Sequence, residues 1–139
     1  MGTATRILIV EDDEVLARST ERLLRRAIAG EVDFRHATTA EVAILLLSCP
    51  DVAGGAFDLC LSDWNLGGSR HGGDVRDFVR SMRVPPAFLF LSSEEALMAA
   101  TGERYLVKPV APRELRDAVL ALVDPPKTVV DMPLEGCAL

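Results

Sequence analysis

The sequence predicts an α/β fold in which helices cover a parallel β-sheet on both faces. Short apolar segments alternate five times along the chain with segments whose apolar residues have helical spacing. Residues 7–10 (Ile-Leu-Ile-Val) are continuously apolar, which is typical of a strand buried on both faces of a parallel sheet. Strands of such a sheet are joined by right-handed crossovers through the helices.

The predicted strands end abruptly at polar or acidic residues. The first is followed directly by Glu11-Asp12-Asp13, and the third leads to Asp63. In the second, polar and apolar residues alternate, as in a half-exposed strand. The predicted strands cover residues 7–10, 32–36, 57–61, 87–91 and 104–107.

Capping and breaking residues delimit the predicted helices. Thr38 or Thr39 supplies the N-cap of the second helix, and Pro50 marks its end. Pro112 occupies the first turn of the last helix, where proline is tolerated. The fourth helix is short, with room for about two turns. The predicted helices cover residues 15–28, 39–47, 74–82, 94–100 and 112–122.

Composition limits the function classes. The 139 residues suit one domain, and the net charge of −6 disfavours binding to nucleic acid through general phosphate attraction. Cys49, Cys60 and Cys137 form no CxxC pair, so we expect neither a zinc site nor a disulfide framework, in keeping with a cytoplasmic location. The sequence shows no signal peptide and no apolar stretch long enough to cross a bilayer, so we expect no membrane association.

Chemically useful side chains follow four of the five predicted strands. In open parallel sheets, ligands bind at the carboxyl ends of the strands. The residues at these ends are Glu11, Asp12, Asp63, Ser92 and Lys108. Neighbouring strands are only ~4.8 Å apart, so we expect these side chains to share one site.

Three clustered carboxylates repel one another unless a cation lies among them. Hard oxygen ligands of this kind favour Mg²⁺. A carboxylate can also act as a nucleophile and form an aspartyl phosphate, while a lysine neutralises phosphoryl oxygens. The residues therefore predict Mg²⁺-assisted phosphoryl transfer onto an aspartate. The alternative is that these acids are solvated loop residues with no chemical role.

Four motifs in order resemble the receiver domain of two-component response regulators, and in particular single-domain, chemotaxis-type receivers. The motifs are Val-Glu-Asp-Asp (10–13), Leu-Ser-Asp-Trp-Asn-Leu (61–66), Phe-Leu-Ser-Ser (90–93) and Tyr-Leu-Val-Lys-Pro (105–109). The resemblance covers residues 6–123 and leaves 124–139 as a tail or linker. It implies a flavodoxin-like, doubly wound, five-stranded sheet with strand order 2-1-3-4-5, the order known for this family.

The resemblance also implies the roles of the acidic residues. Asp63 corresponds to the phosphoacceptor. Asp12 corresponds to a direct Mg²⁺ ligand and Glu11 to one that acts through water. The main-chain carbonyl of Asn65 would be a further ligand of the metal ion. Asp13 is expected to begin a helix rather than to bind metal.

The remaining matched residues correspond to the phosphoryl-binding and switch positions. Lys108 would pair with the phosphoryl group, and its bond to Pro109 is often cis in this family. Ser92 takes the place of the hydroxyl that moves to the phosphoryl oxygen, and Tyr105 that of the aromatic that then turns inward. The donor would be a phosphohistidine of a sensor histidine kinase or phosphotransfer protein, and the output a conformational change read by a partner protein or a homodimer.

Two departures from the family pattern affect these expectations. Residues 67–73 form a glycine-rich loop about one residue longer than usual, and we expect it to be mobile. The segment between Ser92 and Lys108 is shorter than usual, so the fourth helix is shortened. We therefore hypothesise that the chain signals through an altered surface. His36 and His71 are isolated in the sequence and are expected to be structural or solvated.

Several alternative functions stay open at this point. The chain could be a pseudo-receiver that binds partners without phosphotransfer, or a receiver fragment of a larger regulator or hybrid kinase. An aspartyl-phosphate hydrolase is disfavoured because Asn65 stands where those enzymes carry a second acid. An FMN carrier is disfavoured because the acidic run after the first strand would repel a phosphate. Beyond self-catalysed phosphorylation and dephosphorylation, we expect no enzyme activity.

Overall fold

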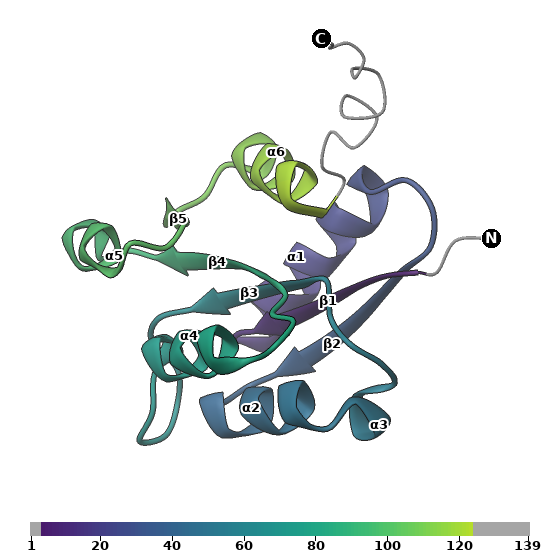
Figure 1. The fold of residues 1–139 in the computed structure, drawn as a ribbon. Coiled ribbons are helices and arrows are strands. Elements are labelled where there is room, and N and C mark those ends of the chain that lie inside the picture. Colours follow the sequence, from purple (N-terminus) through teal and green to yellow (C-terminus); the bar gives the residue numbers. More distant parts are fainter. Residues whose placement is uncertain (1–3, 124–139) are drawn as a thin grey trace, which may run out of the picture.

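The computed structural model describes residues 4–123 and contains one five-stranded sheet (Figure 1). The strands are β1 (Thr5–Val10), β2 (Val32–Ala37), β3 (Leu59–Asp63), β4 (Ala87–Ser92) and β5 (Tyr105–Val107). All neighbouring strands pair in parallel, in the order β2-β1-β3-β4-β5. The predicted fold class and strand order are therefore confirmed.

Helices cover both faces of the sheet (Figure 1). The described residues contain α1 (Glu14–Ala27), α2 (Ala40–Ser48), α3 (Pro50–Ala53), α4 (Gly72–Ser81), α5 (Glu95–Thr101) and α6 (Pro112–Val123). One core lies between the sheet and α1 and α6, and the other between the sheet and α2 to α5. Alternate residues of β1 enter the two cores, with Ile7 and Ile9 on the first side and Leu8 and Val10 on the second. This arrangement explains why the strand sequence is continuously apolar.

Side-chain caps set the starts of the first two helices. The Asp13 carboxylate accepts hydrogen bonds from the amides of Val15 and Leu16, at 3.0 and 3.2 Å, so Asp13 begins α1 as expected. The Thr39 hydroxyl accepts a hydrogen bond from the amide of Val42 at 3.2 Å, so Thr39 rather than Thr38 caps α2.

A short helix, α3, lies where the sequence predicted only a loop. Pro50 does end α2, but it also occupies the first position of α3, where its missing amide hydrogen costs nothing. Gly54 ends this single turn with a φ of 89°, a conformation that favours glycine.

The helix α5 corresponds to the predicted fourth helix. It has seven residues, so this helix is short, as predicted. It ends at Gly102, whose φ is 78°. Among residues 4–123, no helix has both the length and the hydropathy to cross a membrane. The predicted tail at 124–139, with Cys137, lies outside the described residues.

Candidate functional site

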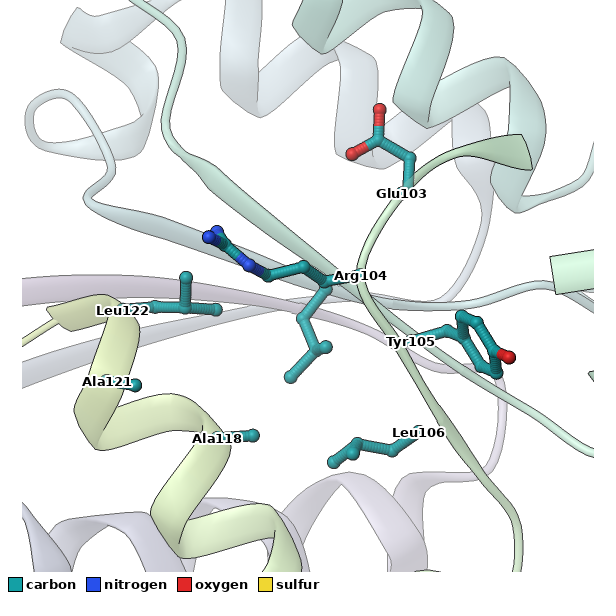
Figure 2. Close-up of a pocket in the computed structure, with 8 residues that line it drawn as sticks. Glu103, Arg104, Tyr105, Leu106, Ala118, Ala121 and Leu122 are labelled. Atoms are coloured by element: carbon teal, nitrogen blue, oxygen red, sulfur yellow. The ribbon is translucent and has the colours of Figure 1, made fainter. Parts of the chain in front are cut away.

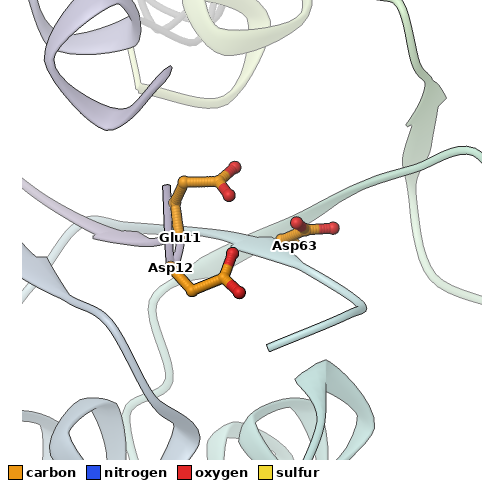
Figure 3. Close-up of side chains that lie close together, drawn as sticks. All are labelled: Glu11, Asp12 and Asp63. Atoms are coloured by element: carbon orange, nitrogen blue, oxygen red, sulfur yellow. The ribbon is translucent and has the colours of Figure 1, made fainter. Parts of the chain in front are cut away.

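The carboxylates of Glu11, Asp12 and Asp63 lie together at the carboxyl edge of the sheet (Figure 3). One oxygen from each lies within 4.8 Å of the others. Glu11 and Asp12 follow β1 and Asp63 ends β3, and these strands are paired neighbours. Glu11 and Asp63 are each only 8% exposed, whereas Asp12 faces solvent. The structure thus brings together the three acids that the sequence singled out.

Lys108, which directly follows β5 at the edge of the sheet, joins this cluster. Its ammonium nitrogen Nζ lies 3.0 Å from Asp63 Oδ2 and 3.3 Å from Glu11 Oε1. Its backbone amide donates to the Ser92 carbonyl at 2.9 Å, which continues the pairing of β5 with β4. The Lys108–Pro109 peptide bond is cis.

Burial shapes the charges at this site. Burial and the nearby charge of Asp63 raise the pKa of Glu11 to about 6, although the Lys108 ammonium acts in the opposite direction. Burial alone would lower the pKa of Lys108, but its hydrogen bonds and charge interactions with Asp63 and Glu11 raise it instead. Lys108 therefore stays protonated, and one ammonium faces three carboxylates. This excess of negative charge favours a bound cation.

The free oxygen atoms of the cluster fit a hard divalent cation such as Mg²⁺. Glu11 uses one carboxylate oxygen for Lys108 and the other for the amide of Asp13, at 3.2 Å. Asp12 makes no hydrogen bond with any other residue in the range 4–123 and is exposed. The chemistry of these donors therefore suits a metal ion among the three carboxylates, with Asp12 offering the oxygens that are hydrogen-bonded to no other described residue.

Asn65 and Ser92 lie at the same edge. The backbone amide nitrogen of Asn65 lies 3.4 Å from Asp63 Oδ1. The side-chain amide of Asn65 donates a hydrogen bond to Glu94 Oε2 at 3.3 Å. Ser92 ends β4 next to the end of β3 and is fully buried. Its hydroxyl accepts a hydrogen bond from the Glu94 amide at 3.1 Å.

Tyr105 has no hydrogen bond or ion pair with the carboxylate cluster among the described residues. It begins β5 and pairs with Phe90, two residues before Ser92. Its half-buried ring packs against the core beneath α2, α4 and α5. Tyr105 is therefore on the strand that leads directly to Lys108.

A stacked pair of rings that the sequence did not predict lies beside the site. The His71 ring lies over the Trp64 ring, with centroids 4.5 Å apart and an angle of 20° between the planes. His71 also caps α4, which therefore begins at Gly72 and not at Asp74 as predicted. Asp74, three residues after His71, is the residue from which a capping box could have been predicted. His36 is structural as expected, and its Nε2 lies 2.6 Å from Glu21 Oε1.

Two cavities lie near α6. One of about 520 Å³ adjoins the carboxylate cluster and is bordered by Glu11, Lys108 and apolar residues of α1 and α6. The other, of about 380 Å³, lies between β5 and α6, away from the carboxylates. Figure 2 shows Leu106, Ala118 and Leu122 around this second cavity, with the Arg104 side chain above it.

The sequence matches no protein-family model and no curated protein. Several solved structures are similar. A response regulator receiver protein from Sinorhizobium medicae is 23% identical with a TM-score of 0.73, covering 87% of this chain and 95% of that one. A CheY-like receiver domain from Methanospirillum hungatei is 22% identical with a TM-score of 0.71, covering 91% and 99%. The phosphorylated cyanobacterial phytochrome response regulator RcpA is 18% identical with a TM-score of 0.68, covering 96% of each chain.

These similarities, at low sequence identity, establish the fold. The chain has the fold of a response regulator receiver domain. The acidic cluster and Lys108 lie at the carboxyl edge of its parallel sheet, where ligands bind in folds of this kind.

Proposed function

We propose that this chain is a phosphoacceptor receiver that takes a phosphoryl group onto Asp63. The donor is a phosphohistidine of a sensor histidine kinase or phosphotransfer protein, which places the chain in the cytoplasm. The observation that carries the proposal is the contact of a protonated lysine, Lys108, with Asp63 inside a cluster of three carboxylates. The fold shared with a phosphorylated response regulator supports it.

The transfer follows from the placement of these side chains. A carboxylate oxygen of Asp63 attacks phosphorus, the bond from phosphorus to the histidine nitrogen breaks, and the departing imidazole nitrogen takes up a proton. Lys108 offers its ammonium charge to the phosphoryl oxygens beside Asp63. Asp12, Asp63, the Asn65 main-chain carbonyl and, through water, Glu11 would hold Mg²⁺. The metal ion, when bound, neutralises charge on the transferred group.

Ser92 and Tyr105 then carry the switch. The phosphoryl group adds negative charge and acceptor oxygens at the strand end next to the Ser92 hydroxyl. In the proposal, this hydroxyl leaves the Glu94 amide for a phosphoryl oxygen, and the Tyr105 ring turns inward. The short α5 beside β5 alters the surface that a downstream protein or a second copy of the chain would recognise.

The direct test is phosphorylation by a small phosphodonor. We expect acetyl phosphate with Mg²⁺ to label the wild-type chain in intact-mass spectra, and chelation of Mg²⁺ to prevent the labelling. Asp63→Asn removes the nucleophile and should abolish the label. Asp51→Asn, at an exposed acid of α3, is the matched control and should label normally.

Two results would contradict the proposal. A label that persists in Asp63→Asn would show that another residue accepts the phosphoryl group. If neither acetyl phosphate nor beryllofluoride changes the wild-type chain in the presence of Mg²⁺, the chain is a pseudo-receiver that binds partners without phosphotransfer.

A further inference from the structure

The loop after Asp63 leaves the site and returns to it. The Gly72 amide donates a 2.8 Å hydrogen bond to the Trp64 carbonyl, which closes the loop at its base. Gly72 lies so close to this base that a Cβ there would overlap the Asp63 carbonyl oxygen. The start of α4 is therefore packed directly against the backbone of the proposed phosphoacceptor.

The Trp64 ring of this loop lies between a buried ring of the core and a ring at the surface. Trp64 lies between Phe90, at a centroid distance of 5.5 Å, and His71, at 4.5 Å. The His71 ring is itself held, because its Nδ1 accepts a hydrogen bond from the Gly73 amide at 3.0 Å. A Cβ on Gly73 would lie 2.7 Å from His71 and 2.9 Å from Trp64, so a glycine is needed for this stack to form.

Asn65 lies between two residues that pack against the core. Its neighbours in the chain, Trp64 and Leu66, are both partly buried and pack against the core beneath α2 and α4. Beyond Leu66, Gly67 forms an isolated parallel β-bridge with Thr39, and Gly68 has a φ of 93°, a conformation that favours glycine. The Asn65 main chain is therefore anchored on both sides, and the His71 ring covers the anchor at Trp64.

We propose that His71 is a positioning residue for the metal site. By stacking on Trp64, it holds the main chain of Asn65 beside the Asp63 carboxylate, where its carbonyl can serve as a metal ligand. This inference rests on the proposed function, since it requires a metal ion at the acidic cluster. Groups that support metal ligands contribute to affinity through orientation even though they never touch the ion.

The two contacts of His71 can be separated by two substitutions. His71→Asn keeps a side-chain acceptor that suits a helix N-cap and removes the ring. His71→Phe keeps a ring for stacking and removes the acceptor. His71 is half exposed, at 50% of its side chain, so both replacements fit without burying a new group.

We expect His71→Asn to raise the Kd for Mg²⁺, measured by isothermal titration calorimetry, about tenfold, the lower end of the range for residues that support metal ligands. His71→Phe should stay within about twofold of wild type in Kd and should instead lower the thermal unfolding midpoint through the lost cap. Without metal, hydrogen exchange at the amides of Asn65 and Leu66 should accelerate in His71→Asn and not in His71→Phe. Ser69→Ala, in the same loop and exposed, is the control.

The outcomes separate this inference from the proposed function. A wild-type Kd in His71→Asn, or an equal loss of affinity in both variants, would overturn the positioning role while leaving phosphorylation of Asp63 intact. If the wild-type chain binds no Mg²⁺ at all, the proposed function fails and the positioning role fails with it.

Discussion

The Lys108 ammonium contacts the Asp63 carboxylate at 3.0 Å although the strands that carry them are not neighbours. Lys108 follows β5, Asp63 ends β3, and β4 lies between them. The long lysine side chain reaches across the end of β4 and also meets Glu11 at 3.3 Å. The Lys108 ammonium thus compensates part of the charge of the carboxylate cluster.

Removing the Lys108 charge should affect metal binding and phosphorylation in opposite directions. In Lys108→Met, no ammonium competes for the carboxylates, so we expect Mg²⁺ to bind more tightly by calorimetry. Labelling by acetyl phosphate should slow about a hundredfold, because the phosphoryl oxygens lose a preorganised cation. Arg83→Met, at an exposed arginine beyond the end of α4, controls for the loss of one positive charge. Weaker Mg²⁺ binding in Lys108→Met would argue against this competition.

Asp12 and its neighbour Asp13 should respond differently to the same substitution. Asp12→Asn removes an exposed, unbonded carboxylate from the cluster and should weaken Mg²⁺ binding more than tenfold. Asp13→Asn retains a good N-cap for α1, so metal binding and unfolding free energy should both stay close to wild type. Calorimetric titration and urea unfolding of the two variants provide the comparison. Equal Mg²⁺ affinities in both would remove Asp12 from the metal site.

The close approach of Gly72 to the site should tolerate no side chain. A Cβ there meets the Asp63 carbonyl oxygen and the Trp64 backbone, neither of which can move away as a flexible side chain would. We expect Gly72→Ala to lower the free energy of unfolding by about 2 kcal/mol, as overpacking does. Gly67→Ala, where a Cβ meets nothing within 4 Å, should have little effect. Urea unfolding measures both, and similar stabilities for the two variants would show that α4 can shift away from the site.

The ion pairs of Glu21 should make a small, pH-dependent contribution to stability. Burial acts to raise the pKa of Glu21, but the hydrogen bonds and charges of Arg25 and His36 outweigh it and hold the pKa below the ordinary value of 4.5. A lowered folded-state pKa stabilises the protein above pH 4.5, and this stabilisation is lost as the pH falls through the folded-state value. We expect Glu21→Gln to cost about 0.5 kcal/mol at neutral pH, the usual size for exposed helix pairs.

Unfolding free energies of wild type and Glu21→Gln, measured in urea at pH values above and below 4.5, check the direction of this pH dependence. The difference between the two proteins should shrink in acid well below pH 4.5. A difference that grows with acidification would mean that the carboxylate is disfavoured in the folded protein.

Much of the architecture could be predicted because it depends on local pattern. The apolar run at 7–10 is a strand with both faces buried, and Thr39 caps a helix as its residue type suggests. The short helix α3 and the early start of α4 were missed. The helix α3 is a four-residue turn, too short to show helical periodicity. The start of α4 rests on a capping box of His71 and Asp74, in which histidine is not among the usual N-cap residues.

A general rule of parallel sheets predicts which residues form the site, but it does not predict the distances or the charges within the site. Strand ends of a parallel sheet meet at one edge, so Glu11, Asp12 and Asp63 were expected to meet there, as they do. Strand order came from the resemblance to receivers, because alternation of strands and helices alone permits several orders. The raised pKa of Glu11 requires knowledge of its burial and of the Asp63 charge beside it.

The sequence by itself determined the five strands and five of the helices, because helical and strand periodicities and capping preferences act over a few neighbouring residues. The tertiary structure decided which distant groups touch. Lys108 crosses β4 to reach Asp63, and His71 closes over Trp64 across a loop of glycines. The first contact joins residues 45 positions apart in the chain and the second closes a glycine-rich loop, so both depend on side-chain reach and on how the chain folds back.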